Sequence, residues 1–131
     1  MKHGHCLCGA VHYSVRGAFE YAGYCHCPRC RLATGAAFSV FAATPVAHLH
    51  IDQGADRITV YPRNPDNFSH FCACCGTLLY AVVRQGAYAH VQLGTLTEDP
   101  GITPQYHLFV SLKAPWHEIG GELPQFAGYP Q

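Results

Sequence analysis

Three short clusters of cysteine constrain the fold of this chain more than any other feature of its sequence. They hold all eight cysteines of the 131 residues and read Cys6-Leu-Cys8-Gly9, Cys25-His-Cys27-Pro-Arg-Cys30 and Cys72-Ala-Cys74-Cys75-Gly76. Close cysteines from separate loops are typical ligands of tetrahedral zinc, which prefers thiolates at about 2.3 Å. A glycine after such a cluster tolerates the positive φ with which a turn points its amides at the thiolates. We therefore expect one small domain, residues 1–131, organised around metal.

Eight cysteines admit three interpretations. Four disulfides would suit a small secreted protein, but the start of the chain has no apolar stretch of signal-peptide length. No run of about 18 apolar residues is present to span a membrane, so we expect a cytoplasmic protein, in which metal sites are commoner than disulfides. One zinc ion with spare thiols is the second interpretation. Two metal-binding clusters is the third, and the spacing favours it, although iron would accept the same ligands.

The spacing of the outer clusters favours a closed site. Cys72 and Cys75 have the separation of a zinc knuckle, whereas the neighbours Cys74 and Cys75 cannot easily point into one site. Pairing Cys72 and Cys75 with Cys6 and Cys8 would give four thiolates around one ion. Cys74 is then left over, and we expect it to be a buried, apolar thiol.

The middle cluster would be an open site. Cys25, Cys27 and Cys30 supply three ligands, which leaves a coordination position for water or substrate, as in catalytic zinc sites. Arg29 and Arg31 lie beside these ligands and could hold a substrate carboxylate, although surface arginines in solvent would give the same sequence.

Short runs of alternating apolar and polar residues predict β-strands. One run holds Val11, Tyr13 and Val15, and similar strands are expected around Phe38–Phe41, Ile58–Tyr61, Phe68–Phe71, Leu78–Val83, Tyr88–Leu93 and Tyr106–Ser111. No segment has a persuasive helical period over ten residues, and at most one or two helical turns are expected after Cys30. We therefore expect an all-β fold of short, folded-over antiparallel strands. Lys plus Arg number 8 and Asp plus Glu number 8, a balance that predicts neither nucleic acid nor a membrane as partner.

The motifs together resemble those of the glutathione-dependent formaldehyde-activating enzymes, a family that includes centromere protein V-like zinc proteins. The matching segments span nearly the whole chain and are Gly4–Tyr13, Cys25–Arg31, Gly35-Ala-Ala-Phe38, Phe71–Thr77 and Ala114-Pro-Trp116. This resemblance implies a complex antiparallel β fold stabilised by zinc, also seen in the small zinc-binding guanine-nucleotide release factors.

The resemblance also implies two Zn²⁺ ions per chain and a role for each cluster. By resemblance, the structural zinc ligands are Cys6, Cys8, Cys72 and Cys75, and the catalytic zinc ligands are Cys25, Cys27 and Cys30. The reaction it implies joins formaldehyde to glutathione as S-(hydroxymethyl)glutathione, which in reverse is a carbon–sulfur lyase reaction on a small thiol–aldehyde adduct. Arg31 is the candidate contact for such a substrate.

Two other functions fit the same residues. The chain could be a non-catalytic zinc-binding module for a protein partner, or a redox or metal sensor whose middle cluster releases zinc on oxidation. Among the remaining residues, we expect His26 to project away from the metal and Trp116 to pack in the core.

Overall fold

The computed structural model describes residues 1–130, which fold mainly into β-strands arranged as two sheets. One α-helix, α1 (Pro28–Thr34), interrupts the strands in this part of the chain. The strands are β1 (Lys2–His5), β2 (His12–Val15), β3 (Tyr21–Cys25), β4 (Ser39–Pro45), β5 (Leu49–Gln53), β6 (Ile58–Asn64), β7 (Asn67–Cys72), β8 (Leu78–Val83), β9 (Tyr88–Gln92) and β10 (His107–Leu108). The all-β prediction is confirmed. None of the helices within residues 1–130 has the length and apolar character that a membrane span requires.

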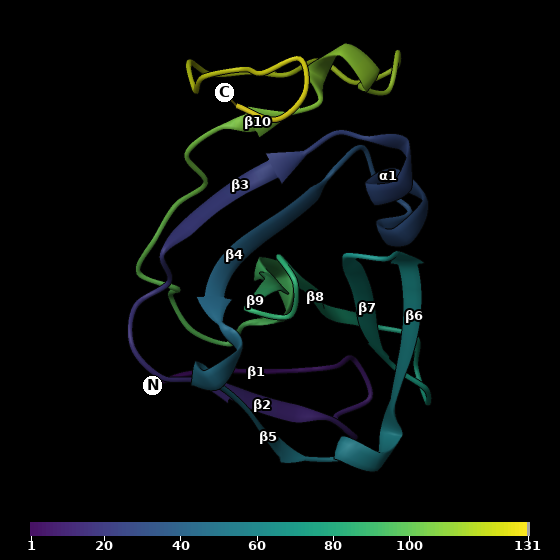
Figure 1. Cartoon of the computed structure of the whole chain (residues 1–131), viewed down its shortest axis with the longest axis vertical. Helices are drawn as coiled ribbons and strands as arrows, with labels where there is room; N and C mark the ends of the chain where they lie inside the picture. The colour runs from purple at the N-terminus through teal and green to yellow at the C-terminus, as the bar shows by residue number, and fades with distance from the viewer. Residues whose placement is uncertain (131) are drawn as a thin grey trace.

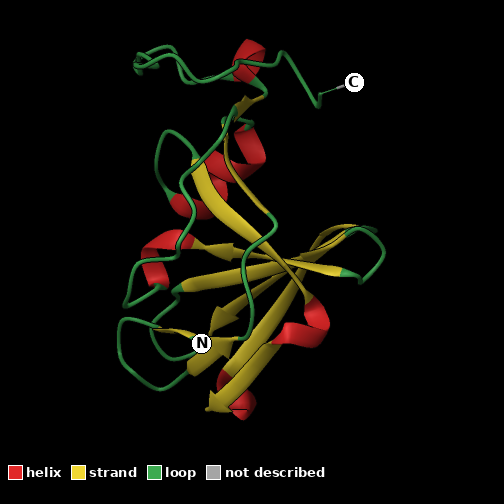
Figure 2. Ribbon diagram, turned by 90° about the vertical axis from the view of Figure 1, so that its left-hand side faces the viewer, coloured by secondary structure: helices red, strands yellow, loops and turns green. Residues whose placement is uncertain are grey.

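The two sheets are antiparallel except at one edge. The small sheet has the order β1-β2-β5, and the large sheet has the order β10-β3-β4-β9-β8-β7-β6. Only the pairing of β10 with β3 is parallel among the described strands, and it places Leu108 beside Cys25. In Figure 1 the small sheet lies below the large one, and the segment that follows β10 lies at the top. Figure 2 shows that this last segment is mostly loop. Because β10 pairs with the end of β3, the start of the segment lies next to Cys25.

The core lies between the two sheets. Tyr13 of β2 is 1% exposed and faces Ala42, Ala89 and Val91 of the large sheet, which are fully buried. The Tyr13 hydroxyl and Thr95 Oγ1 are 2.6 Å apart, so the polar end of this buried ring is hydrogen-bonded. Full burial of one large apolar side chain contributes about 1.5–3 kcal/mol. Because side chains alternate along a strand, the large sheet presents its other face away from this core.

Several elements differ from the sequence expectation. The strand expected at Tyr106–Ser111 is only His107–Leu108, because Phe109 has a left-handed φ of 56° and a 3₁₀ turn follows. Strand β3 was not predicted, because its residues do not alternate between apolar and polar. Its Gly23 lies against the Tyr106 ring, where a Cβ would overlap the ring.

The core position expected for Trp116 is wrong. Trp116 is 70% exposed, whereas Ala114 is fully buried. A turn at Pro115 and Trp116, closed by a 3.2 Å hydrogen bond from the His117 N–H to the Ala114 carbonyl, directs the indole to solvent.

Candidate metal centres and active site

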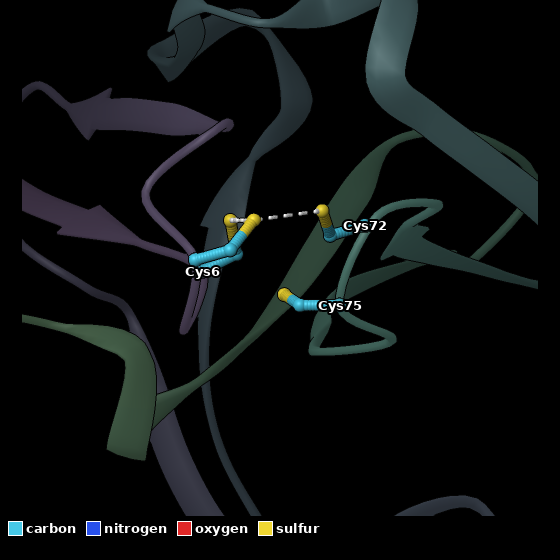
Figure 3. A group of neighbouring side chains, drawn as sticks. Cys6, Cys72 and Cys75 are labelled. Carbon is cyan, nitrogen blue, oxygen red and sulfur yellow. Dashed lines mark hydrogen bonds between the residues drawn. The ribbon is translucent and has the colours of Figure 1, made fainter.

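The first and third cysteine clusters meet in space. Cys6 and Cys8 lie in the loop between β1 and β2, and Cys72 and Cys75 lie at the end of β7 and in the turn that follows (Figure 3). The four Sγ atoms all lie within 4.8 Å of one another, with Cys6–Cys8 at 3.7 Å and Cys8–Cys72 at 3.9 Å. Four thiolates around zinc, each at about 2.3 Å, would have sulfurs about 3.8 Å apart. The donor set therefore fits one tetrahedral zinc ion.

Hydrogen bonds around this cluster favour negative sulfur. The Val11 N–H donates to Cys6 Sγ at 3.3 Å, and the Thr77 hydroxyl lies 3.2 Å from Cys75 Sγ. The contact with Thr77 lowers the pKa of Cys75 to about 5. The Ala10 amide lowers the pKa of Cys8, but desolvation and the neighbouring thiols outweigh it and raise the value to about 12. The pKa is lowered for Cys6 and Cys75 and raised for Cys8 and Cys72, so four ionised sulfurs require a cation.

The middle cluster is built where β3 passes into α1. Cys25 ends the strand, Cys27 is the N-cap of the helix and Cys30 lies in its first turn. The N–H of Cys30 donates to Cys27 Sγ at 3.3 Å. Proline suits position 28 because an N–H in the first helical turn would have no partner within the helix. All three Sγ atoms lie within 4.8 Å of one another. Among residues 1–130, no fourth cysteine, histidine or acidic side chain joins them.

The thiols of the middle cluster also share their charge unevenly. Hydrogen bonds from Cys25 and Cys30 lower the pKa of Cys27 to about 2, and the bond with Cys27 raises the pKa of Cys25 far above its usual value. Three neighbouring thiols cannot all be ionised without a positive charge between them. The cluster therefore fits a cation with three protein ligands, and zinc accepts this donor set.

His26 lies between two of these cysteines in the sequence but does not join the cluster. Its ring is fully buried, and its Nε2 lies 2.8 Å from Nδ1 of His107. Burial lowers the pKa of His26 to about 4, so the ring is neutral at physiological pH. The ring supports the loop that carries the cluster and does not face solvent.

A cavity of about 1000 Å³ opens beside the middle cluster. All three cysteines line it, together with side chains on the face of the large sheet that points away from the core. Strand β4 contributes Ser39, which pairs with Cys25, and β9 contributes Gln92, whose Nε2 donates to Ser39 Oγ at 3.1 Å. The Phe109 and Tyr129 rings, which pack edge to face with centroids 4.8 Å apart, line the cavity from the C-terminal segment.

Three arginines, Arg29, Arg63 and Arg84, and one acid, Asp66, are the charged residues that line this cavity. Arg63 of β6 donates from Nε to Ser69 Oγ at 2.6 Å and from its NH1 group to Cys30 Sγ at 3.8 Å. Arg29 donates to the Arg63 carbonyl at 2.7 Å. Arg31, the sequence candidate, instead donates to a backbone carbonyl at 3.2 Å and is not among the residues that line the cavity. Arg63 was missed because it is 33 residues from Cys30 in the sequence, and only the fold brings the two together.

Cys74 is not the buried thiol that the sequence suggested. It is exposed, and the Arg57 guanidinium donates to its Sγ at 3.2 Å. Cys72 and Cys75 point towards Cys6 and Cys8, and the two residues between them, Ala73 and Cys74, are exposed.

The comparison with known families identifies the relatives of this chain. The model of the glutathione-dependent formaldehyde-activating enzyme family matches residues 1–112, which include all three cysteine clusters. The chain belongs to this family. A crystal structure of a Rhodobacter sphaeroides protein, a structural-genomics target, matches with a TM-score of 0.63 over 94% of this chain and 98% of that one. Its sequence identity is 24%, so this likeness shows the shared fold. Membership in the family connects the chain to glutathione and formaldehyde chemistry, and its two cysteine clusters suit metal binding.

Proposed function

We propose that this chain is a zinc-dependent carbon–sulfur lyase that acts on a small thiol–aldehyde adduct such as S-(hydroxymethyl)glutathione. The single observation that carries the proposal is the three-thiol cluster of Cys25, Cys27 and Cys30, which opens on a cavity while the other cluster is complete with four sulfurs. A metal site with three protein ligands and an open position is the usual form of a catalytic zinc site. Family membership supports the same reaction.

Zinc at this cluster would supply a coordination position at which a thiol sulfur is held as thiolate. In the lyase direction, the carbon–sulfur bond of the adduct breaks and its electron pair returns to sulfur. The hydroxyl of the adduct loses its proton as the carbonyl of formaldehyde forms. In the opposite direction, the thiolate adds to the carbonyl carbon and the oxygen takes up a proton.

The residues of the chain would orient and stabilise these groups. The Arg63 guanidinium, next to Cys30 Sγ, places positive charge where the substrate sulfur becomes negative. Its hydrogen bond to Ser69 fixes its position, so little reorganisation is needed during the reaction. Ser39 and Gln92, hydrogen-bonded to each other beside Cys25, offer a hydroxyl and an amide to the oxygen of the adduct. We propose Arg63 as the substrate contact in place of Arg31.

The complete four-sulfur cluster would serve the fold. It joins the β1–β2 loop of the small sheet to the end of β7 in the large sheet, so an ion there ties the two sheets together. All eight cysteines are free thiols, which suits metal ligation in a reducing compartment such as the cytoplasm.

The test is exchange between formaldehyde, glutathione and their adduct, measured by NMR with the zinc-loaded protein. We expect the protein to accelerate exchange above the spontaneous rate, and Cys27→Ser to abolish the acceleration. Cys74→Ser is the matched control, because Cys74 belongs to neither cluster, and it should keep the wild-type rate. If the wild-type protein leaves the rate unchanged and no thiol perturbs cobalt bound at the middle cluster, the lyase proposal fails and a non-catalytic zinc module becomes the better interpretation.

A further inference from the structure

The far end of the cavity holds a second group of polar side chains. Tyr21 and Cys25 lie on the same face of β3, four residues apart, which corresponds to about 13 Å along a strand. His90 of β9 and Arg84, which follows β8, line the cavity at the Tyr21 end. The two ends of one cavity therefore present different chemistry, thiols at one and an arginine with two polar rings at the other.

Arg84 is exposed, and two tyrosines, Tyr21 and Tyr88, hold its guanidinium. It lies in the turn between β8 and β9, where Arg84 and Gln85 have left-handed φ values of 55° and 58°. Its guanidinium lies 4.5 Å from the centroid of the Tyr88 ring and donates to the Tyr21 hydroxyl at 3.3 Å. Non-glycine residues in this conformation are strained and persist where the surrounding structure requires them, often at functional sites.

A hydrogen-bonded chain runs inward from this guanidinium. The Tyr21 hydroxyl lies 2.9 Å from Nε2 of His90, and the His90 ring stacks on Phe41 with centroids 4.3 Å apart. Burial and the nearby Arg84 charge lower the pKa of His90 to about 4, which leaves the ring neutral. Arg84 therefore provides the positive charge of this group.

The Arg84 charge has no counterion within the described part of the chain. No carboxylate oxygen of residues 1–130 lies within 4.0 Å of its guanidinium. Two acids near this turn have other partners: Glu20 accepts a hydrogen bond from the Tyr88 hydroxyl at 2.8 Å, and Asp66, which also lines the cavity, accepts one from the Gln85 N–H at 2.5 Å. A fixed arginine with free donors facing a cavity is suited to a carboxylate ligand.

We propose that Arg84, Tyr21 and His90 form a distal subsite that binds a carboxylate of the thiol substrate. This inference rests on the proposed function, because it assumes that the substrate sulfur lies at the middle cluster. In glutathione the thiol is on the central residue, so a terminal carboxylate lies up to about two extended residues, about 7 Å, from it along the backbone, and the Cys25 and Arg84 side chains that line the cavity cover the rest of the span. The subsite therefore selects anionic thiols of tripeptide length over cysteine, whose carboxylate lies too close to its sulfur.

The test compares Arg84→Gln with wild type and with a control variant, Arg16→Gln. Arg16 is an exposed arginine that directly follows β2 and does not line the cavity. Glutamine is under the same backbone constraint as arginine at this φ, so the turn is perturbed little. Calorimetry on the zinc-loaded proteins measures binding of glutathione, cysteine and S-methylglutathione, which carries both carboxylates but no thiol. Cobalt-loaded protein reports sulfur ligation separately through its visible spectrum.

We expect Arg84→Gln to weaken glutathione and S-methylglutathione by about tenfold, the effect of losing one charge-assisted hydrogen bond, and to leave cysteine unchanged. Arg84→Lys should recover part of the loss, and Arg16→Gln should bind as wild type does. Equal unfolding midpoints would show that the variants are folded.

The outcomes separate this inference from the proposed function. If Arg84→Gln binds glutathione and S-methylglutathione as tightly as wild type, the distal subsite is overturned while the thiol site stands. If S-methylglutathione binding depends on Arg84 but no thiol changes the cobalt spectrum, the subsite stands as an anion site and the lyase proposal fails. If neither thiol nor S-methylglutathione binds the wild-type protein, both are overturned.

Discussion

Replacing one cysteine of each cluster by serine should damage the protein in two different ways. Cys72 is fully buried, and its Sγ lies 3.9 Å from that of Cys8. A structural zinc site contributes about 10–16 kcal/mol to folding, as much as or more than the 5–15 kcal/mol net stability of a typical domain. Losing one of four ligands, and leaving a buried hydroxyl in its place, should therefore unfold or aggregate the Cys72→Ser protein.

Cys27→Ser should leave the fold intact. Cys27 is the N-cap of α1, and its Sγ accepts the N–H of Cys30. Serine is itself a preferred N-cap, so its hydroxyl keeps this interaction and the contribution of the cap should change by no more than about 1 kcal/mol. The helix buries no residue, so the core is untouched. We expect a folded protein that has lost one of its two metal ions.

Circular dichroism and native mass spectrometry of zinc-loaded protein measure both effects. Wild type and Cys74→Ser should carry two zinc ions, and Cys27→Ser should carry one and keep the β-sheet signal of the spectrum, with at most the small helical signal of α1 reduced. The assignment of the two clusters is refuted if Cys27→Ser unfolds while Cys72→Ser folds and loses a single ion.

Two further predictions concern stability. As pH falls from 6.5 towards 4, the unfolded chain takes up a proton at His90 that the folded chain does not, so the free energy of unfolding should fall by up to about 3 kcal/mol. His90→Phe should make this fall shallower in urea titrations at pH 7.5, 6 and 5. An unchanged dependence of the unfolding free energy on pH would contradict the reasoning. Gly54 has a φ of 79°, and a Cβ there would overlap the Ala10 carbonyl in the loop that carries Cys6 and Cys8. Gly54→Ala should therefore cost at least about 2 kcal/mol in the same titrations and weaken zinc retention, whereas Gly86→Ala, which has a φ of 84° but open space, should cost less.

The grouping of the cysteines could be predicted from the sequence because metal ligands carry their geometry in their spacing. Cys72 and Cys75 belong to one cluster and Cys74 does not, as the spacing predicted. Cys74 was expected to be buried, but it is exposed. Strands such as Leu78–Val83 were predictable from their apolar runs. Strand β3 was not predictable, because its small residues Ala22 and Gly23 are required by tertiary packing: Ala22 is fully buried and Gly23 lies against the Tyr106 ring.

The wall of the cavity could not be predicted in this way. Arg63 of β6, Arg84 of the turn after β8 and His90 of β9 line one cavity because the large sheet sets the register of these elements. No local pattern distinguishes such an arginine from one in solvent, as the choice of Arg31 illustrates. Only the pairing of strands decides which side chains share the cavity with the thiols.

The helix beside the middle cluster connects metal binding at that cluster to local order of the chain. Helix α1 has only seven residues, buries none of them and begins at Cys27, a proposed ligand. An isolated helix of this length is marginal in water. Because α1 buries no residue, tertiary packing adds little, and the cap and a bound ion would contribute much. Loss of the ion would then fray the segment that forms one rim of the cavity. Metal occupancy, helix order and the shape of the entrance are thus one equilibrium rather than three.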